Sequence, residues 1–167
     1  MERRDPTSLD EGEMLAEYLD WYRAGVVEKV SGLEHEQLHR ELVPSGTTIG
    51  GLVKHLAGVE DYWFQWIFVG IDELEPWSSA PWDDDPDWDF HSAAEDTPEE
   101  LIGLYVAACE RSRAATAGVD LSTPAAQERE DLHPDLRWIM VHLLEETARH
   151  LGHLDVLREL IDGVTGE

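Results

Sequence analysis

The stretch HLLEETARHLGHLD, from His142 to Asp155, decides both the fold and the site that we expect for this 167-residue chain. Its apolar residues recur at steps of three and four, which predicts a helix with one buried face. Glu146 and His150 are four residues apart, so on a helix their side chains project the same way. Burying a carboxylate or an imidazole is costly without a partner, and a divalent metal is one such partner. The stretch therefore predicts two arms of a metal site.

The same helical periodicity occurs in four segments of the chain. They lie at about residues 9–31, 48–70, 97–118 and 135–163. The second segment has Thr47 or Thr48 as its N-cap, and in the third Pro98 fits the first helical position after a capping Thr97. The fourth is the longest, and we expect it to stop at Gly163.

The connections between these segments show neither sustained alternation nor hairpin signals, so we expect no extensive sheet. No Gly-rich phosphate loop is present either. Four amphipathic helices of similar length around one core predict an all-α four-helix bundle, and the long connections allow a crossover topology. We expect a single domain over residues 1–167, with a loop rich in Trp and Asp at about residues 71–96.

Composition restricts the partners and the compartment. The chain has 12 Lys and Arg against 37 Asp and Glu, for a net charge of −25. Such a charge repels nucleic acid and anionic membranes, so we expect neither as a partner. The single cysteine, Cys109, excludes an intrachain disulfide, and we find no signal peptide and no apolar span of membrane length. We expect a cytoplasmic protein.

A third ligand for the metal must come from another helix. At about 100° per residue, Glu146 and His150 fall toward the apolar face, whereas His142 and His153 fall nearer its polar boundary. On the second helix, His55 shares a face with apolar residues one turn away and points away from the polar side. We therefore predict His55, Glu146 and His150 as the ligands.

Simpler interpretations of these residues stay open. A semi-buried histidine such as His55 is often a hydrogen-bonded core residue. Glu146 can pair with Arg149 at the surface, and His150 can stack in the core. The remaining histidines fall in loop-like or solvated contexts, and we leave them out of the site: His35, His39, His91 and His133.

Two motifs resemble a known family. They are TTIGGLVKHLAGVE at residues 47–60 and EETARHLGHLD at residues 145–155. With them, nearly the whole chain resembles the DinB-like (YfiT-like) superfamily of metal enzymes, in particular its actinobacterial mini-circle-type branch. The resemblance implies a four-helix bundle with a divalent metal held by His55 and by two residues four apart on the last helix.

The chain departs from this family pattern at two positions. Many members have histidine where this chain has Glu146, although the thiol-dependent maleylpyruvate isomerase branch has a similar His, Glu, His set. Related members often carry glutamine where this chain has His153. His153 is therefore a candidate fourth ligand, or a residue that contacts a ligand without binding the metal itself.

Two histidines and one carboxylate leave open positions on a zinc-like ion, as in catalytic sites. The residues alone do not choose between hydrolysis and activation of a thiol. The resemblance favours the thiol, since relatives are similar to S-transferases that use mycothiol or bacillithiol. We expect a divalent-metal-dependent thiol S-transferase with zinc, or nickel or another ion, acting on a small electrophile. The alternatives are a metal-dependent hydrolase and a non-enzymatic binding or stress-response module, metal-stabilised or metal-free.

Other features have two interpretations. The aromatic residues of the 71–96 loop form either a lid over the metal or a packed surface loop. The aspartates of this loop do not fit a calcium-binding pattern. Cys109 fits a small core residue better than a nucleophile. Trp63 and Trp66 fit core or dimer contacts, and the resemblance allows a homodimer.

Overall fold

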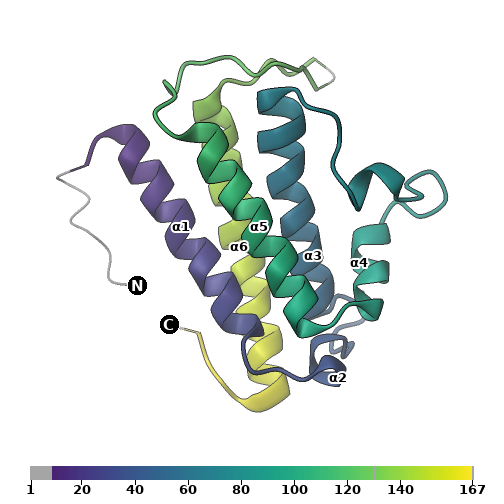
Figure 1. The fold of residues 1–167 in the computed structure, drawn as a ribbon. Helices are drawn as coiled ribbons and strands as arrows, with labels where there is room; N and C mark the ends of the chain where they lie inside the picture. Colours follow the sequence, from purple (N-terminus) through teal and green to yellow (C-terminus); the bar gives the residue numbers. More distant parts are fainter. Residues whose placement is uncertain (1–8, 130, 167) are drawn as a thin grey trace.

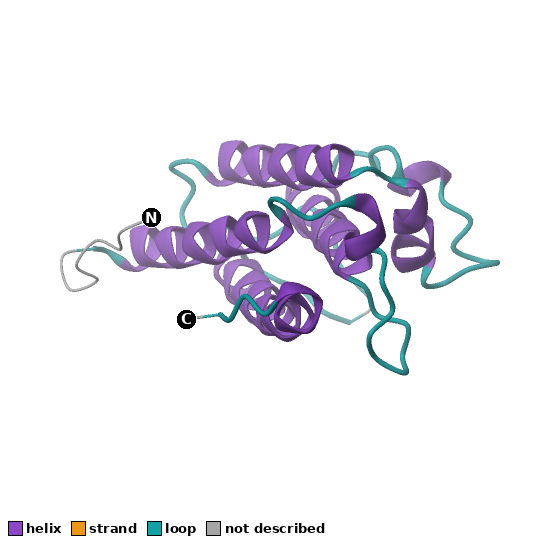
Figure 2. Cartoon of the chain, turned by 90° about the horizontal axis from the view of Figure 1, so that it is seen from below, coloured by secondary structure: helices purple, strands orange, loops and turns teal. Residues whose placement is uncertain are grey.

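The computed structural model describes residues 9–129 and 131–166, and this part of the chain is helical without a strand. The prediction of an all-α fold is confirmed (Figures 1 and 2). Four long helical stretches lie side by side. They are α1 (Glu11–Val30), α3 (Ile49–Glu60) with its continuation η2 (Asp61–Val69), α5 (Pro98–Thr116) and α6 (Leu136–Asp162). α1 packs mainly on α6, and α3 packs mainly on α5.

Short helices occupy two segments that we expected to be connections. They are α2 (His35–Leu38), the 3₁₀ turn η3 (Trp77–Ser79), α4 (Trp88–Ser92) and the 3₁₀ turn η4 (Ala93–Glu95). A helix of one turn is too short to produce a periodic apolar pattern, so these elements had no sequence signal. Within the described residues, each helix is too short or too polar to cross a lipid bilayer.

The long helices begin and end close to the predicted positions. Thr48 accepts a hydrogen bond from the Gly51 amide at 3.0 Å, and Thr97 caps α5 with Pro98 following it. At the other end of the fold, Gly163 has φ of +79°, a left-handed conformation that glycine adopts without strain. Local capping chemistry therefore sets the helix ends.

The second predicted helix changes its type halfway. From Asp61 to Val69 it is a π-helix, in which amides bond to carbonyls five residues earlier, as the Gly70 amide does to Gln65 at 3.1 Å. Six of the nine side chains of this π-helix are buried, so the helix is surrounded by protein on most of its sides. The buried ones are Asp61, Trp63, Phe64, Gln65, Ile67 and Phe68. Segments of this kind often occur at functional sites.

A polar layer divides the core into two apolar clusters. One cluster joins η2 to the N-terminal halves of α1 and α6, and the other joins α3 and α5 to their C-terminal halves. Between the clusters each long helix contributes a buried polar side chain. They are Arg23 on α1, Glu60 at the end of α3, Ser112 on α5 and Thr147 on α6.

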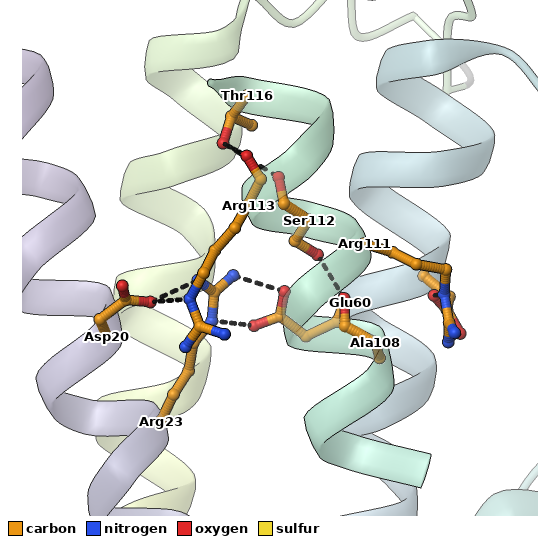
Figure 3. Close-up of polar contacts among 9 residues, drawn as sticks. Asp20, Arg23, Glu60, Ala108, Arg111, Ser112, Arg113 and Thr116 are labelled. Atoms are coloured by element: carbon orange, nitrogen blue, oxygen red, sulfur yellow. Dashed lines mark hydrogen bonds and ion pairs between the residues drawn. The ribbon is translucent and has the colours of Figure 1, made fainter. Parts of the chain in front are cut away.

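The strongest contact in this layer is a buried ion pair (Figure 3). Arg23 donates from Nε and Nη2 to the two carboxylate oxygens of Glu60, at 2.7 and 2.6 Å. The two residues are only 4% and 1% exposed. Arg23 also donates to Asp20 at 2.9 Å, and Arg113 of α5 reaches the same carboxylate. The network thus fixes α1 against α3 and α5.

Replacing Arg23 with methionine should destabilise the protein by about 3–5 kcal/mol, because Glu60 would stay buried without its partner. Urea unfolding followed by circular dichroism measures the loss. The matched control is Arg137→Met, since the pair of Arg137 with Glu11 lies at the exposed surface and should matter little. Equal stability of the two variants would contradict the importance of the buried pair.

Candidate metal centre

The three predicted ligands come together in the structure. His55 of α3 and Glu146 and His150 of α6 offer one ligand atom each, and these atoms lie within 4.8 Å of one another. His150 Nε2 is 3.2 Å from Glu146 Oε2. The rings of His55 and His150 meet edge to face, with centroids 5.1 Å apart. All three side chains are half-buried, so they are held in place and still accessible.

Asp89 orients the first of these ligands. Nδ1 of His55 is 2.7 Å from Oδ2 of Asp89, which lies on α4 and is nearly buried. A carboxylate only accepts hydrogen bonds, so Nδ1 donates in this contact, and the tautomer with the proton on Nδ1 is the one that offers the Nε2 lone pair to a metal. Phe90 stacks on the same imidazole with ring centroids 5.0 Å apart. The sequence has seven aspartates over residues 71–96 and no local signal that singles out Asp89.

His153 stands behind the second histidine. Its Nδ1 is 3.3 Å from Nδ1 of His150, and its side chain is exposed. The converging group of ligand atoms does not include one from His153. Burial, followed by the nearby charge of His55, lowers the pKa of His150. A neutral imidazole is the form that binds metals.

The donor set fits a divalent ion. Two imidazole nitrogens and a carboxylate oxygen match the ligand types of zinc and of similar ions. Histidines that bind metal usually have a hydrogen-bond partner on the other ring nitrogen. His55 has Asp89 in this position, and His150 has His153. Such an ion would bridge α3 and α6.

A pocket of about 460 Å³ opens beside this group, and His55, Asp89 and Glu146 form part of its wall. The remaining wall comes mainly from η2 and the 71–96 segment, and it includes five Tyr and Trp side chains. The aromatic residues are Tyr62, Trp63, Trp66, Trp77 and Trp82. A concave apolar site with a few converging polar groups is typical of small-molecule binding.

The 71–96 segment is a packed wall of this pocket. Trp77 is 4% exposed, and its indole donates to buried Asp61 at 3.0 Å. The indole of Trp82 donates to the carbonyl oxygen of Trp77, also at 3.0 Å. Trp88 packs edge to face against both indoles. The segment therefore combines features of both interpretations, since it is anchored and it lines the pocket.

The wall of the pocket also includes residues that the sequence analysis did not assign to a binding site. Trp63 is buried in the core as expected, and both Trp63 and Trp66 line the pocket. His142 lies in the pocket wall, stacked on Trp138 with ring centroids 5.0 Å apart. The histidines that we left out of the site have other neighbours in the fold. His35 packs against His39 with tilted rings, His39 lies near the Asp96 carbonyl, His91 pairs with Asp85, and His133 pairs with Glu128.

The helical fold thus places a His, Glu, His group, whose donor types fit a divalent ion, beside a pocket of a size that fits a small molecule. The family model described as Mycothiol-S-transferase matches residues 14–163. The chain therefore belongs to the mycothiol S-transferase family, within the DinB-like superfamily that its sequence resembles. The matched range includes His55, Glu146 and His150. Among curated proteins, none matches the chain.

Removing the carboxylate behind His55 should weaken metal binding. For Asp89→Asn we expect about 10–100-fold lower zinc affinity, because His55 loses the acceptor that fixes its tautomer and orientation. Competition with a chromophoric chelator measures this affinity. Asp85→Asn is the matched control, since Asp85 pairs with exposed His91 instead. Equal zinc affinity of the two variants would show that Asp89 does not support metal binding.

Cys109 should be chemically inert in the folded protein. It is 2% exposed, and burial raises the pKa of its thiol to about 12, with a further increase from Glu60. At pH 8 the thiol therefore keeps its proton, and a thiol reacts only as thiolate. Ellman's reagent should detect no free thiol before denaturation and one afterwards. Rapid labelling of native protein would contradict the core placement.

Proposed function

We propose that this protein is a metal-dependent thiol S-transferase in which His55, Glu146 and His150 hold a divalent ion, zinc or another such as nickel. The observation that carries the proposal is the convergence of these side chains beside an aromatic pocket. Membership of the mycothiol S-transferase family supports a low-molecular-weight thiol such as mycothiol as the cosubstrate.

The family also supports the bundle architecture. We propose that α1, α3 with η2, α5 and α6 form a four-helix bundle of the DinB-like kind, with its long connections crossing the ends. The close packing of α1 on α6 and of α3 on α5 supports this arrangement. Placing ligands on two facing helices is typical of metal sites in bundles.

Each ligand residue has a defined task in this proposal. A divalent ion lowers the pKa of a neighbouring thiol, so that the sulfur is present as a nucleophilic thiolate. Glu146 supplies the negative charge of the donor set, while His55 and His150 are neutral donors. Asp89 and His153 keep the two imidazoles oriented from behind.

The pocket residues select and position the electrophile. The indoles of Trp66, Trp77 and Trp82 provide apolar surface and exclude water from the reacting atoms. Arg129 lies over the rings of Tyr62 and Trp63, at 5.6 and 5.5 Å from their centroids. The apolar surfaces of the three indoles favour an electrophile with an apolar body. In the reaction the thiol loses its proton and its sulfur forms a bond to a carbon of the electrophile. The bond from that carbon to its leaving group breaks, and the leaving group departs with the electron pair and takes up the proton.

His150→Ala should reduce both metal content and activity, because it removes a ligand. We expect a loss of more than about 100-fold in the formation of mycothiol conjugates with a panel of small electrophiles, larger than the effect of losing a supporting partner. Mass spectrometry detects the conjugates, and elemental analysis of untagged protein measures bound metal. His91→Ala is the control, since His91 pairs with Asp85 at the surface.

Three outcomes of this experiment would contradict the proposal. One is a protein that binds neither zinc nor nickel after purification without chelators. Another is hydrolysis of a substrate without thiol, which indicates a hydrolase. The third is a His150→Ala variant that melts earlier while the wild type conjugates no electrophile, which indicates a non-enzymatic module.

A further inference from the structure

One arginine in the wall of the pocket has no carboxylate partner. Most of the lysine and arginine side chains that the structure describes form ion pairs with Asp or Glu. They are Arg23, Lys29, Lys54, Arg111, Arg113, Arg137 and Arg158. Arg40, Arg129 and Arg149 form none with a described residue, and among these three Arg129 lines the pocket beside the metal centre. In a chain with 37 acidic residues, an arginine of this kind keeps its charge available to a ligand.

Backbone hydrogen bonds fix the turn that carries Arg129. The amide of Gln127 donates to the carbonyl oxygen of Ile67 in η2 at 3.0 Å. The amides of Arg129 and Leu132 each donate to the carbonyl oxygen of the other, at 3.1 and 2.9 Å. This turn is therefore tied to the same π-helix that contributes to the aromatic wall of the pocket.

The side chain of Arg129 is held by two of these aromatic residues. Its guanidinium carbon lies 5.6 Å from the ring centroid of Tyr62 and 5.5 Å from that of Trp63. A guanidinium that lies over aromatic rings is attracted by them and still has N–H groups to donate to an acceptor. The rings thus restrict Arg129 without using its hydrogen-bonding capacity.

His142 contacts the same indole from α6. Its ring centroid is 4.8 Å from that of Trp63, and its ring also stacks on Trp138. His142 lines the pocket, and neither of its ring nitrogens forms a hydrogen bond with a described residue. An imidazole has at least one N–H donor. Arg129 and His142 therefore offer donors from two separate segments beside one indole.

None of the acidic side chains in the pocket wall pairs with Arg129. Asp61, Asp89 and Glu146 each have another partner. Glu73 has no ion pair among the described residues, and no hydrogen bond with them holds its side chain in place. Arg129 is therefore the charge of the wall that is both fixed in position and left for a ligand.

We propose that Arg129 and His142 form an anion-binding subsite of the pocket, which takes a carboxylate group of the electrophile. A guanidinium binds a carboxylate through two parallel hydrogen bonds, and the imidazole adds a further donor. His142 lies one helical turn before Glu146, about 6 Å along α6 at 1.5 Å per residue. The carboxylate and the reacting carbon thus belong at different ends of the ligand. This inference rests on the proposed function, because it names the class of electrophile for that reaction.

Two matched electrophiles test the selection of a carboxylate. They are para-(chloromethyl)benzoate and its neutral carboxamide, which share the apolar ring, the reacting carbon and the chloride leaving group. We expect the wild type to have about tenfold or more higher kcat/KM for the carboxylate, mainly through KM, since hydrogen bonds to a charged acceptor are strong. Arg129→Met should abolish this preference. His142→Phe keeps the ring contacts without the N–H donor and should reduce the preference about threefold or more.

Direct binding tests the subsite without turnover. The compound para-methylbenzoate has no leaving group, and isothermal titration calorimetry measures its dissociation constant. In Arg129→Met this constant should rise by about tenfold or more. Arg40→Met is the matched control, since it removes the same charge from an exposed residue outside the pocket and should leave the constant unchanged. Circular dichroism verifies that each variant is folded.

The outcomes separate this inference from the proposed function. Equal affinity of the wild type and Arg129→Met for para-methylbenzoate would overturn the subsite, and it is the result expected if the carboxylate binds the metal ion instead. An equal loss of affinity in Arg40→Met would also overturn it, because net charge alone would then explain the effect. A wild type that conjugates both electrophiles equally well would overturn the selection of a carboxylate. Binding that depends on Arg129, in a protein that conjugates neither electrophile, would support the subsite and contradict the proposed reaction.

Discussion

Two consecutive buried carboxylates, Glu60 and Asp61, hold this structure together at the point where α3 becomes the π-helix. Glu60 pairs with Arg23 of α1. Asp61 accepts two hydrogen bonds from Arg111 of α5, both at 2.9 Å, and a third from the indole of Trp77. Buried charges are tolerated only when they are paired in this way. One turn of backbone is thereby tied to α1, to α5 and to the 71–96 segment.

These ties explain why a site can form next to them. His55 lies just before the two carboxylates on α3, and the aromatic pocket wall begins directly after them on η2. Asp61 holds Trp77, which anchors the segment that carries Asp89. The carboxylate that orients His55 is therefore positioned by the same network that separates the two apolar clusters. Structure and proposed chemistry share one set of buried polar contacts.

The sequence predicted the parts of this arrangement that depend on local pattern. Helix ends followed from Thr48, Thr97 and Gly163, and helical phase brought Glu146 and His150 to one face. The π-helix from Asp61 to Val69 was not predictable, because an apolar periodicity indicates a helix without showing its type. Asp89 was not predictable either, since it lies 34 residues from His55 and only tertiary packing joins them.

The central claim is that His55, Glu146 and His150 together bind one divalent ion. A crystal structure of the zinc-loaded protein, with anomalous data collected at the zinc edge, tests it most directly. The account predicts one strong anomalous peak bounded by His55 Nε2, His150 Nε2 and the Glu146 carboxylate, with Asp89 on the far nitrogen of His55. A peak bound by other residues, or zinc-loaded crystals without a peak between α3 and α6, would contradict it.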